Sequence, residues 1–175
     1  MTEPAQIPDQ AAREAAATTF DRNVVVIAGA GTGKTTLLVN RLLYLLMRRT
    51  DPLDLSRIVA LTFTNKAATE MKLRLRERLR SLVNVEGRDN PAAGSGTVSI
   101  ADLRMRYGWT TDEIVARADA ALRDVEKAQI GTLHSFAAHL LRLYPIEAGV
   151  TPTFQTDEDG SRLDEHFTHE RELWL

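Results

Sequence analysis

The segment Ala28–Thr35, which reads Ala-Gly-Ala-Gly-Thr-Gly-Lys-Thr, restricts the fold of this chain more than any other feature. It follows a run of apolar, mostly β-branched residues at 24–28 and precedes leucines with helical spacing at 38–46. A strand that enters a glycine loop and leaves it as a helix is typical of parallel α/β proteins. The sequence therefore predicts a buried strand at 24–28 and a helix after the loop that ends before Pro52.

The chemistry of this loop favours a polyphosphate ligand. Glycines let successive backbone N–H groups turn inward, and the start of the helix adds the positive end of its dipole. Lys34 would reach the β- and γ-phosphates, and the Thr35 hydroxyl would bind Mg²⁺ as the metal ligand. The usual pattern begins with glycine where this chain has Ala28, but Gly31 and Gly33 are retained. The predicted nucleotide-binding residues of the loop are Ala28, Gly29, Ala30, Gly31, Thr32, Gly33, Lys34, Thr35 and Thr36, with Lys34 and Thr35 as the catalytic pair.

A second strand and helix follow in the same order. Residues 58–63 read as a short apolar strand, and Thr64 or Asn65 can cap a helix that runs to about Val83. The apolar positions of this helix are three or four residues apart and form one buried stripe: they are Ala68, Met71, Leu75, Leu79 and Leu82. Alternation of this kind predicts a RecA-like parallel sheet with helices on both faces.

The composition then changes, and the chain is predicted to have four segments. Thr110 and Glu113 form a capping box for one helix, residues 129–133 resemble a strand, and Pro145 closes a further helix that begins at Ser135. The predicted segments are 1–83 (first part of an ATP-binding-type α/β domain), 84–128 (linker and helical insertion), 129–150 (return to the sheet) and 151–175 (acidic tail with a helix from about Ser161).

The distribution of charge qualifies the net charge of −2, which comes from 22 basic and 24 acidic residues. Residues 151–175 hold seven acidic and two basic residues, a balance of −5, so the first 150 residues carry +3. A near-neutral total is therefore no argument against a nucleic-acid partner. The chain has no cysteine, which excludes thiol catalysis, and it has no secretory leader or membrane-spanning stretch, so we expect a cytoplasmic protein without a membrane partner.

Three segments, taken in order, resemble the UvrD/Rep/RecB/AddA group of superfamily 1 DNA helicases. They are the glycine loop at 28–35, the stretch Thr-Phe-Thr-Asn-Lys-Ala-Ala-Thr-Glu-Met at 62–71, and Gly-Thr-Leu-His-Ser-Phe-Ala at 131–137. The insertion before the third segment makes the chain most similar to the RecB/AddA branch. The resemblance covers about residues 8–150 and implies a P-loop NTPase fold, ATP and Mg²⁺ as cofactors, and single-stranded DNA as a partner.

The resemblance also implies roles for individual residues. Gln10 is the candidate for binding the adenine edge, with Gln6 as the fallback and an exposed helix-start glutamine as the alternative. A capped strand-to-helix junction is the alternative for the second segment. The implied DNA-binding residues are Phe63, Thr64, Asn65, Lys66, His134, Ser135 and Phe136.

The sequence carries no apolar run followed by Asp-Glu, the pair that would hold Mg²⁺ and activate water in this group. The acidic cluster Asp157–Asp159 does not follow a buried strand and is rejected as that motif. We therefore expect an incomplete domain: the front end of a 3′ to 5′ helicase acting in DNA repair or recombination, with possible partner subunits as in RecBCD or AddAB complexes, and inactive by itself. The alternatives are a free-standing regulatory module that binds nucleotide without catalysis, and a small-molecule P-loop kinase.

Overall fold

The computed structural model describes residues 9–51, 53–84 and 97–157, together with Arg162 and Phe167. The chain divides into two compact units, Met1–Thr132 and Leu133–Leu175. The segment boundaries predicted at 83, 128 and 150 remain predictions. Gln6, most of the predicted linker and most of the predicted helix after Ser161 lie outside the described residues.

A two-stranded parallel sheet lies in the first unit. Strand β1 (Val59–Thr62) pairs with β2 (Gln129–Thr132), in a register that runs from Val59 opposite Gln129 to Thr62 opposite Thr132. The predicted strands at 58–63 and 129–133 and their parallel pairing are thus confirmed. The chain between them crosses over through helices, as parallel pairing requires.

The predicted strand at 24–28 is wrong for the part of the chain that the structure describes. These residues are not in the sheet, and the side chains of Val25 and Ile27 are 86% and 97% exposed. A β-branched run has strand propensity, but a strand forms only where another strand satisfies its backbone hydrogen bonds. The described residues therefore show a mixed α/β unit with a small sheet, where the sequence predicts a larger one.

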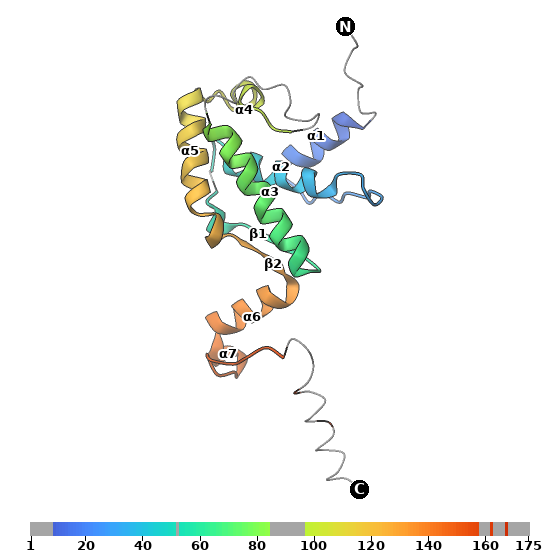
Figure 1. Cartoon of the computed structure of the whole chain (residues 1–175), viewed down its shortest axis with the longest axis vertical. Helices are drawn as coiled ribbons and strands as arrows, with labels where there is room; N and C mark the ends of the chain where they lie inside the picture. The colour runs from blue at the N-terminus through green and yellow to red at the C-terminus, as the bar shows by residue number, and fades with distance from the viewer. Residues whose placement is uncertain (1–8, 52, 85–96, 158–161, 163–166, 168–175) are drawn as a thin grey trace. The chain divides into compact units, whose positions relative to one another are not determined.

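Helix α3 (Asn65–Val83) covers one face of this sheet (Figure 1). The Thr64 hydroxyl oxygen accepts a hydrogen bond from the Ala67 N–H at 3.1 Å, so the predicted N-cap is confirmed. All five residues of the predicted apolar stripe are buried. On the other face of the sheet, Val59 and Leu61 remain largely exposed, so within the described residues helices do not cover both faces.

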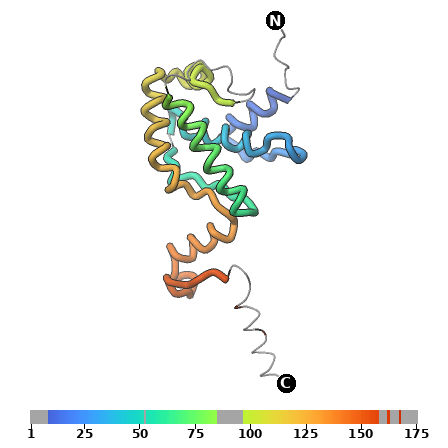
Figure 2. The backbone as a smooth tube through the Cα atoms, viewed as in Figure 1, coloured from blue at the N-terminus to red at the C-terminus, as the bar shows by residue number. Residues whose placement is uncertain are grey.

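Helices α1 (Gln10–Thr18) and α2 (Lys34–Leu46) pack against each other, and the tube in Figure 2 shows them side by side in blue. Arg41 of α2 donates a hydrogen bond to the Ala16 carbonyl at 2.6 Å and stacks over the Phe20 ring at 4.9 Å. Both predicted helices are confirmed. The packing fixes α1 relative to the start of α2, where the glycine loop ends.

The insertion contains two capped helices, α4 (Ile100–Tyr107) and α5 (Thr111–Arg123). The predicted capping box of Thr110 and Glu113 is confirmed, and its hydrogen bonds hold the pKa of the Glu113 carboxyl below its ordinary value. Helix α4 was not predicted, although Ser99 and Asp102 form a second capping box with the same three-residue spacing. Helix α5 runs along α3 and completes the core, as Figure 1 shows in yellow and green.

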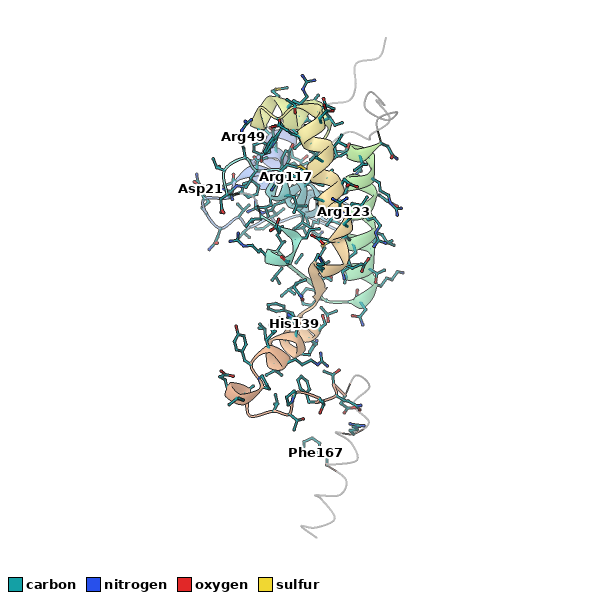
Figure 3. All side chains as sticks on the ribbon, turned by 90° about the vertical axis from the view of Figure 1, so that its left-hand side faces the viewer. Asp21, Arg49, Arg117, Arg123, His139 and Phe167 are labelled. Carbon is teal, nitrogen blue, oxygen red and sulfur yellow. The ribbon has the colours of Figure 1, made fainter. Side chains whose placement is uncertain are left out.

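Residues of the insertion also satisfy the backbone carbonyls at the end of α2. The Trp109 indole N–H donates to the Met47 carbonyl at 2.8 Å, and Arg117 donates to the Leu46 carbonyl. Arg49 donates to the Gly108 carbonyl at 2.9 Å and stacks over the Trp109 ring at 5.0 Å. Figure 3 labels both arginines at this junction. A helix leaves its last carbonyls without partners inside the helix, so these donors tie the insertion to α2.

Two short 3₁₀ turns, η1 (Leu55–Arg57) and η3 (Val125–Lys127), precede β1 and β2. In the second unit, α6 (Leu133–Leu143) is followed by α7 (Pro145–Ala148). Pro145 closes α6, as predicted, and also begins α7, because proline lacks an N–H and suits the first helical position. No helix within the described residues is long and apolar enough to cross a membrane.

Candidate phosphate loop and strand-end residues

The loop between residue 28 and α2 has the backbone form that its glycines allow. Gly31 and Gly33 have φ values of +72° and +84°, which lie in the left-handed region that other residues rarely adopt. Gly33 is the N-cap of α2 and provides no capping side chain, and the first turn of α2 has no acidic residue. The N–H groups that begin α2 are therefore left for a ligand with negative charge.

The Lys34 ammonium group lies against the loop itself. It donates hydrogen bonds to the Ala28 carbonyl at 2.9 Å and to the Gly29 carbonyl. The Thr32 hydroxyl donates to the Gly29 carbonyl at 2.8 Å, which closes the turn. A cation, exposed N–H groups and two left-handed glycines are a donor set that fits the phosphates of a nucleotide.

Two cavities flank the loop, and both are lined by Arg13, Gly33 and Leu37. One has a volume of about 700 Å³ and also includes Ala28, Thr32 and Lys34 among its lining residues. The other, of about 650 Å³, is also lined by Gln10 and Thr36, and by residues of α4. Gly29, Ala30, Gly31 and Thr35 do not line either cavity.

The structure therefore places Gln10 beside the end of the loop. It is the first residue of α1, far from Thr36 in sequence, yet both line the same cavity. Arg13, which no sequence motif indicates, lies on the same helix and reaches the loop directly: its guanidinium donates to the Thr32 carbonyl at 2.9 Å. A single arginine in an Ala-rich helix gives no sequence signal for such a contact.

The second group of predicted residues lies where β1 ends and α3 begins. Phe63 is 98% exposed, and Asn65 and Lys66 are exposed in the first turn of α3. The Thr64 hydroxyl acts as the N-cap described above, which is the structural alternative for this residue. An exposed aromatic ring with amide and ammonium groups beside it suits a stacked base and a phosphate backbone.

The third group lies in the second unit. His134 and Ser135 are exposed and Phe136 is half-buried, all in the first turn of α6. The chain connects this turn directly to β2, whose last residue is Thr132. Within the described residues there is no cluster of three or more histidine or acidic side chains that would hold a metal ion, so Thr35 remains the candidate metal ligand.

Together, these features define an α/β domain with a candidate phosphate loop and exposed polar residues at the carboxyl end of a strand. Residues 9–172 match the UvrD/REP helicase N-terminal domain, and the chain belongs to that family. All three segments that carry the sequence resemblance lie within the matched residues.

Individual relatives agree with the family. The chain is 30% identical over 139 residues to an ATP-dependent helicase/nuclease subunit from Anoxybacillus flavithermus, which covers 79% of this chain and 9% of the relative. The protein of the same name from Desulforudis audaxviator is 32% identical over 84% of this chain and 10% of the relative, and that from Bacillus pumilus is 34% identical over 77% and 9%. The chain thus spans about a tenth of the length of the relatives it matches.

Proposed function

We propose that this chain is the N-terminal ATP-binding part of an ATP-dependent DNA helicase of the AddA type, which moves 3′ to 5′ along single-stranded DNA in repair or recombination. The observation that carries the proposal is the loop at the start of α2, where Lys34 lies against the Ala28 and Gly29 carbonyls and two glycines have positive φ. Membership of the UvrD/REP helicase N-terminal family supports the same function.

In this proposal Lys34 and the N–H groups of residues 31–35 bind the phosphates of ATP, and the Thr35 hydroxyl binds Mg²⁺. Bound ATP supplies the phosphoryl group whose hydrolysis drives movement. Gln10 orients the base from the cavity that it shares with Thr36. The Lys34 ammonium group leaves the two loop carbonyls and neutralises phosphate charge. By itself the chain hydrolyses little, because its sequence has no apolar run that ends in Asp-Glu.

The exposed residues at the end of β1 form the DNA-binding part of the proposal, with Phe63 stacking on a base and Asn65 and Lys66 contacting the backbone. His134, Ser135 and Phe136 at the start of α6 contribute a second contact. The relatives are named as one of the subunits of a helicase/nuclease, and we therefore include a partner protein in the proposal.

Replacing Phe63 by leucine tests the DNA-binding part. We expect single-stranded DNA binding by the chain to weaken at least about fivefold, because stacking on one base contributes roughly 1–3 kcal/mol and leucine has no π-face. Phe63→Trp keeps the aromatic ring and should stay within about twofold of the parent chain. The measurement is fluorescence anisotropy of a labelled oligonucleotide at low salt.

Ile146→Ala provides the control, since Ile146 is an exposed apolar residue of α7 that has no part in the proposal. If the leucine, tryptophan and Ile146→Ala chains all bind DNA as the parent chain does, Phe63 does not stack on a base. Absence of any DNA binding by the parent chain at low salt would contradict the DNA-binding part as a whole.

A further inference from the structure

Arg13 connects α1 to the candidate phosphate loop through two hydrogen bonds. Its Nε donates to the Asp9 carboxylate at 2.8 Å, and its Nη1 donates to the Thr32 carbonyl at 2.9 Å. About 30% of the side chain is exposed, so it is held between the helix and the loop rather than in solvent. The contact spans 19 positions in the sequence and joins the element that carries Gln10 to the loop that carries Lys34.

The bond to Thr32 acts on a peptide between two left-handed glycines. Gly31 and Gly33, with φ values of +72° and +84°, allow the chain to reverse on both sides of Thr32. A Cβ atom added at Gly33 would lie 3.4 Å from Arg13 Nη1, so the guanidinium fits closely against the loop backbone. Arg13 thus fixes the carbonyl of a peptide whose neighbouring N–H groups are the candidate phosphate ligands.

The charges around α2 favour an anion at this place. Arg13 and Lys34 both lie at the start of α2, where the helix dipole is positive and the first turn carries no acidic residue. Asp9 is the carboxylate bonded to Arg13, and that hydrogen bond lowers the pKa of Asp9 from its ordinary value. Two cations at the positive end of a helix repel each other less when a polyanion binds between them.

We propose that Arg13 is a positioning residue of the phosphate site: it holds the Thr32 peptide so that the loop keeps its form when Lys34 leaves the Ala28 and Gly29 carbonyls for the phosphates. This inference rests on the proposed function, because it requires that the loop binds a nucleotide. Arg13 acts on the phosphates through Thr32 and leaves the base to Gln10. Its removal therefore weakens every ligand that contains the polyphosphate by the same factor.

The test is Arg13→Gln in the whole chain, with binding followed by displacement of a fluorescent ATP analogue. We expect ATP, GTP and inorganic tripolyphosphate each to bind roughly tenfold more weakly, with the ratio of ATP to GTP affinity unchanged. Loss of a charge-assisted hydrogen bond has about this effect. Arg13→Lys keeps one donor for the Thr32 carbonyl and should recover part of the affinity, whereas a residue that only packs against the loop would not show this rescue.

Two further variants show whether the effect belongs to the bond between Arg13 and Thr32. Arg123→Gln removes an arginine from an equivalent i,i+4 pair with Asp119, far along the chain from the loop, and should leave all three affinities unchanged. Asp9→Asn removes the ion pair but leaves the bond to Thr32, and should change affinity by less than about threefold. Urea unfolding of each variant shows whether it is folded, and if Arg13→Gln does not fold, the Arg13→Lys chain carries the test.

Binding of ATP and tripolyphosphate by Arg13→Gln within twofold of the parent chain would overturn the inference, as would a change in the ATP to GTP ratio. If Arg13→Gln does not fold, an Arg13→Lys chain that binds as the parent does would also overturn it. Failure of the proposed function gives a different result, since the parent chain would then bind none of these ligands and Lys34→Ala would change nothing.

Discussion

Replacing Leu75 by alanine should lower the free energy of unfolding of this chain by about 3–5 kcal/mol. Leu75 is 0% exposed and lies in the middle of the α3 stripe, in the core cluster that joins α3 to α2, α5 and β2. The change removes buried methyl groups and leaves a cavity that the packed neighbours fill only in part. Domains of this kind unfold with about 5–15 kcal/mol, so the loss is a large fraction of the total.

Leu73→Ala is the matched control for this prediction. Leu73 lies two residues earlier on the same helix but is 50% exposed, and alanine is the better helix former. We expect its effect to stay within about 1 kcal/mol. Urea unfolding followed by circular dichroism measures both variants. Equal losses for the two leucines would show that Leu75 is not in the core and that α3 does not present this stripe to the sheet.

Replacing Lys34 by alanine should weaken the binding of ATP with Mg²⁺ at least tenfold. A hydrogen bond from a charged donor to a phosphate contributes roughly 1.5–3 kcal/mol, and Lys34 supplies such a donor at the end of the loop. Lys34→Met keeps much of the length of the side chain without its charge and should weaken binding to a similar extent. Displacement of a fluorescent ATP analogue measures both variants against the parent chain.

Lys127→Ala is the control for charge, because Lys127 pairs with Asp124 near the end of the insertion and has no part in the proposed site. The unfolding free energy of Lys34→Ala should change by less than about 1 kcal/mol, since the ammonium group is exposed and bonded to loop carbonyls alone. If Lys34→Ala bound ATP as tightly as Lys127→Ala, the loop would not be a phosphate site.

The helices could be predicted where the pattern itself determines burial. The α3 stripe has helical spacing and a threonine cap, and both features act locally, so the structure confirms them. Residues 24–28 show the opposite case. Their β-branched side chains favour a strand, but pairing depends on another segment of chain, and a local pattern does not contain that information. Helix α4 was missed because the Ser99 and Asp102 box lies next to a Gly- and Pro-rich stretch that masked it.

The candidate site divides in the same way. The glycines, Lys34 and Thr35 are consecutive in the chain, so their pattern was sufficient to predict the loop. The place of Gln10 beside Thr36 depends on how α1 packs on α2, and a resemblance to known helicases was needed to suggest it. Arg13 had no motif, and its contact with Thr32 is visible only once both helices are in place.

The central claim, that the loop at the start of α2 binds a polyphosphate, is tested most directly by competition. The parent chain is loaded with a fluorescent ATP analogue and Mg²⁺ and then titrated in parallel with ATP, inorganic tripolyphosphate and AMP. We predict that ATP and tripolyphosphate displace the analogue and that AMP, which carries a base but no polyphosphate, does not at the same concentrations. Displacement by AMP equal to that by ATP, with none by tripolyphosphate, would contradict the claim.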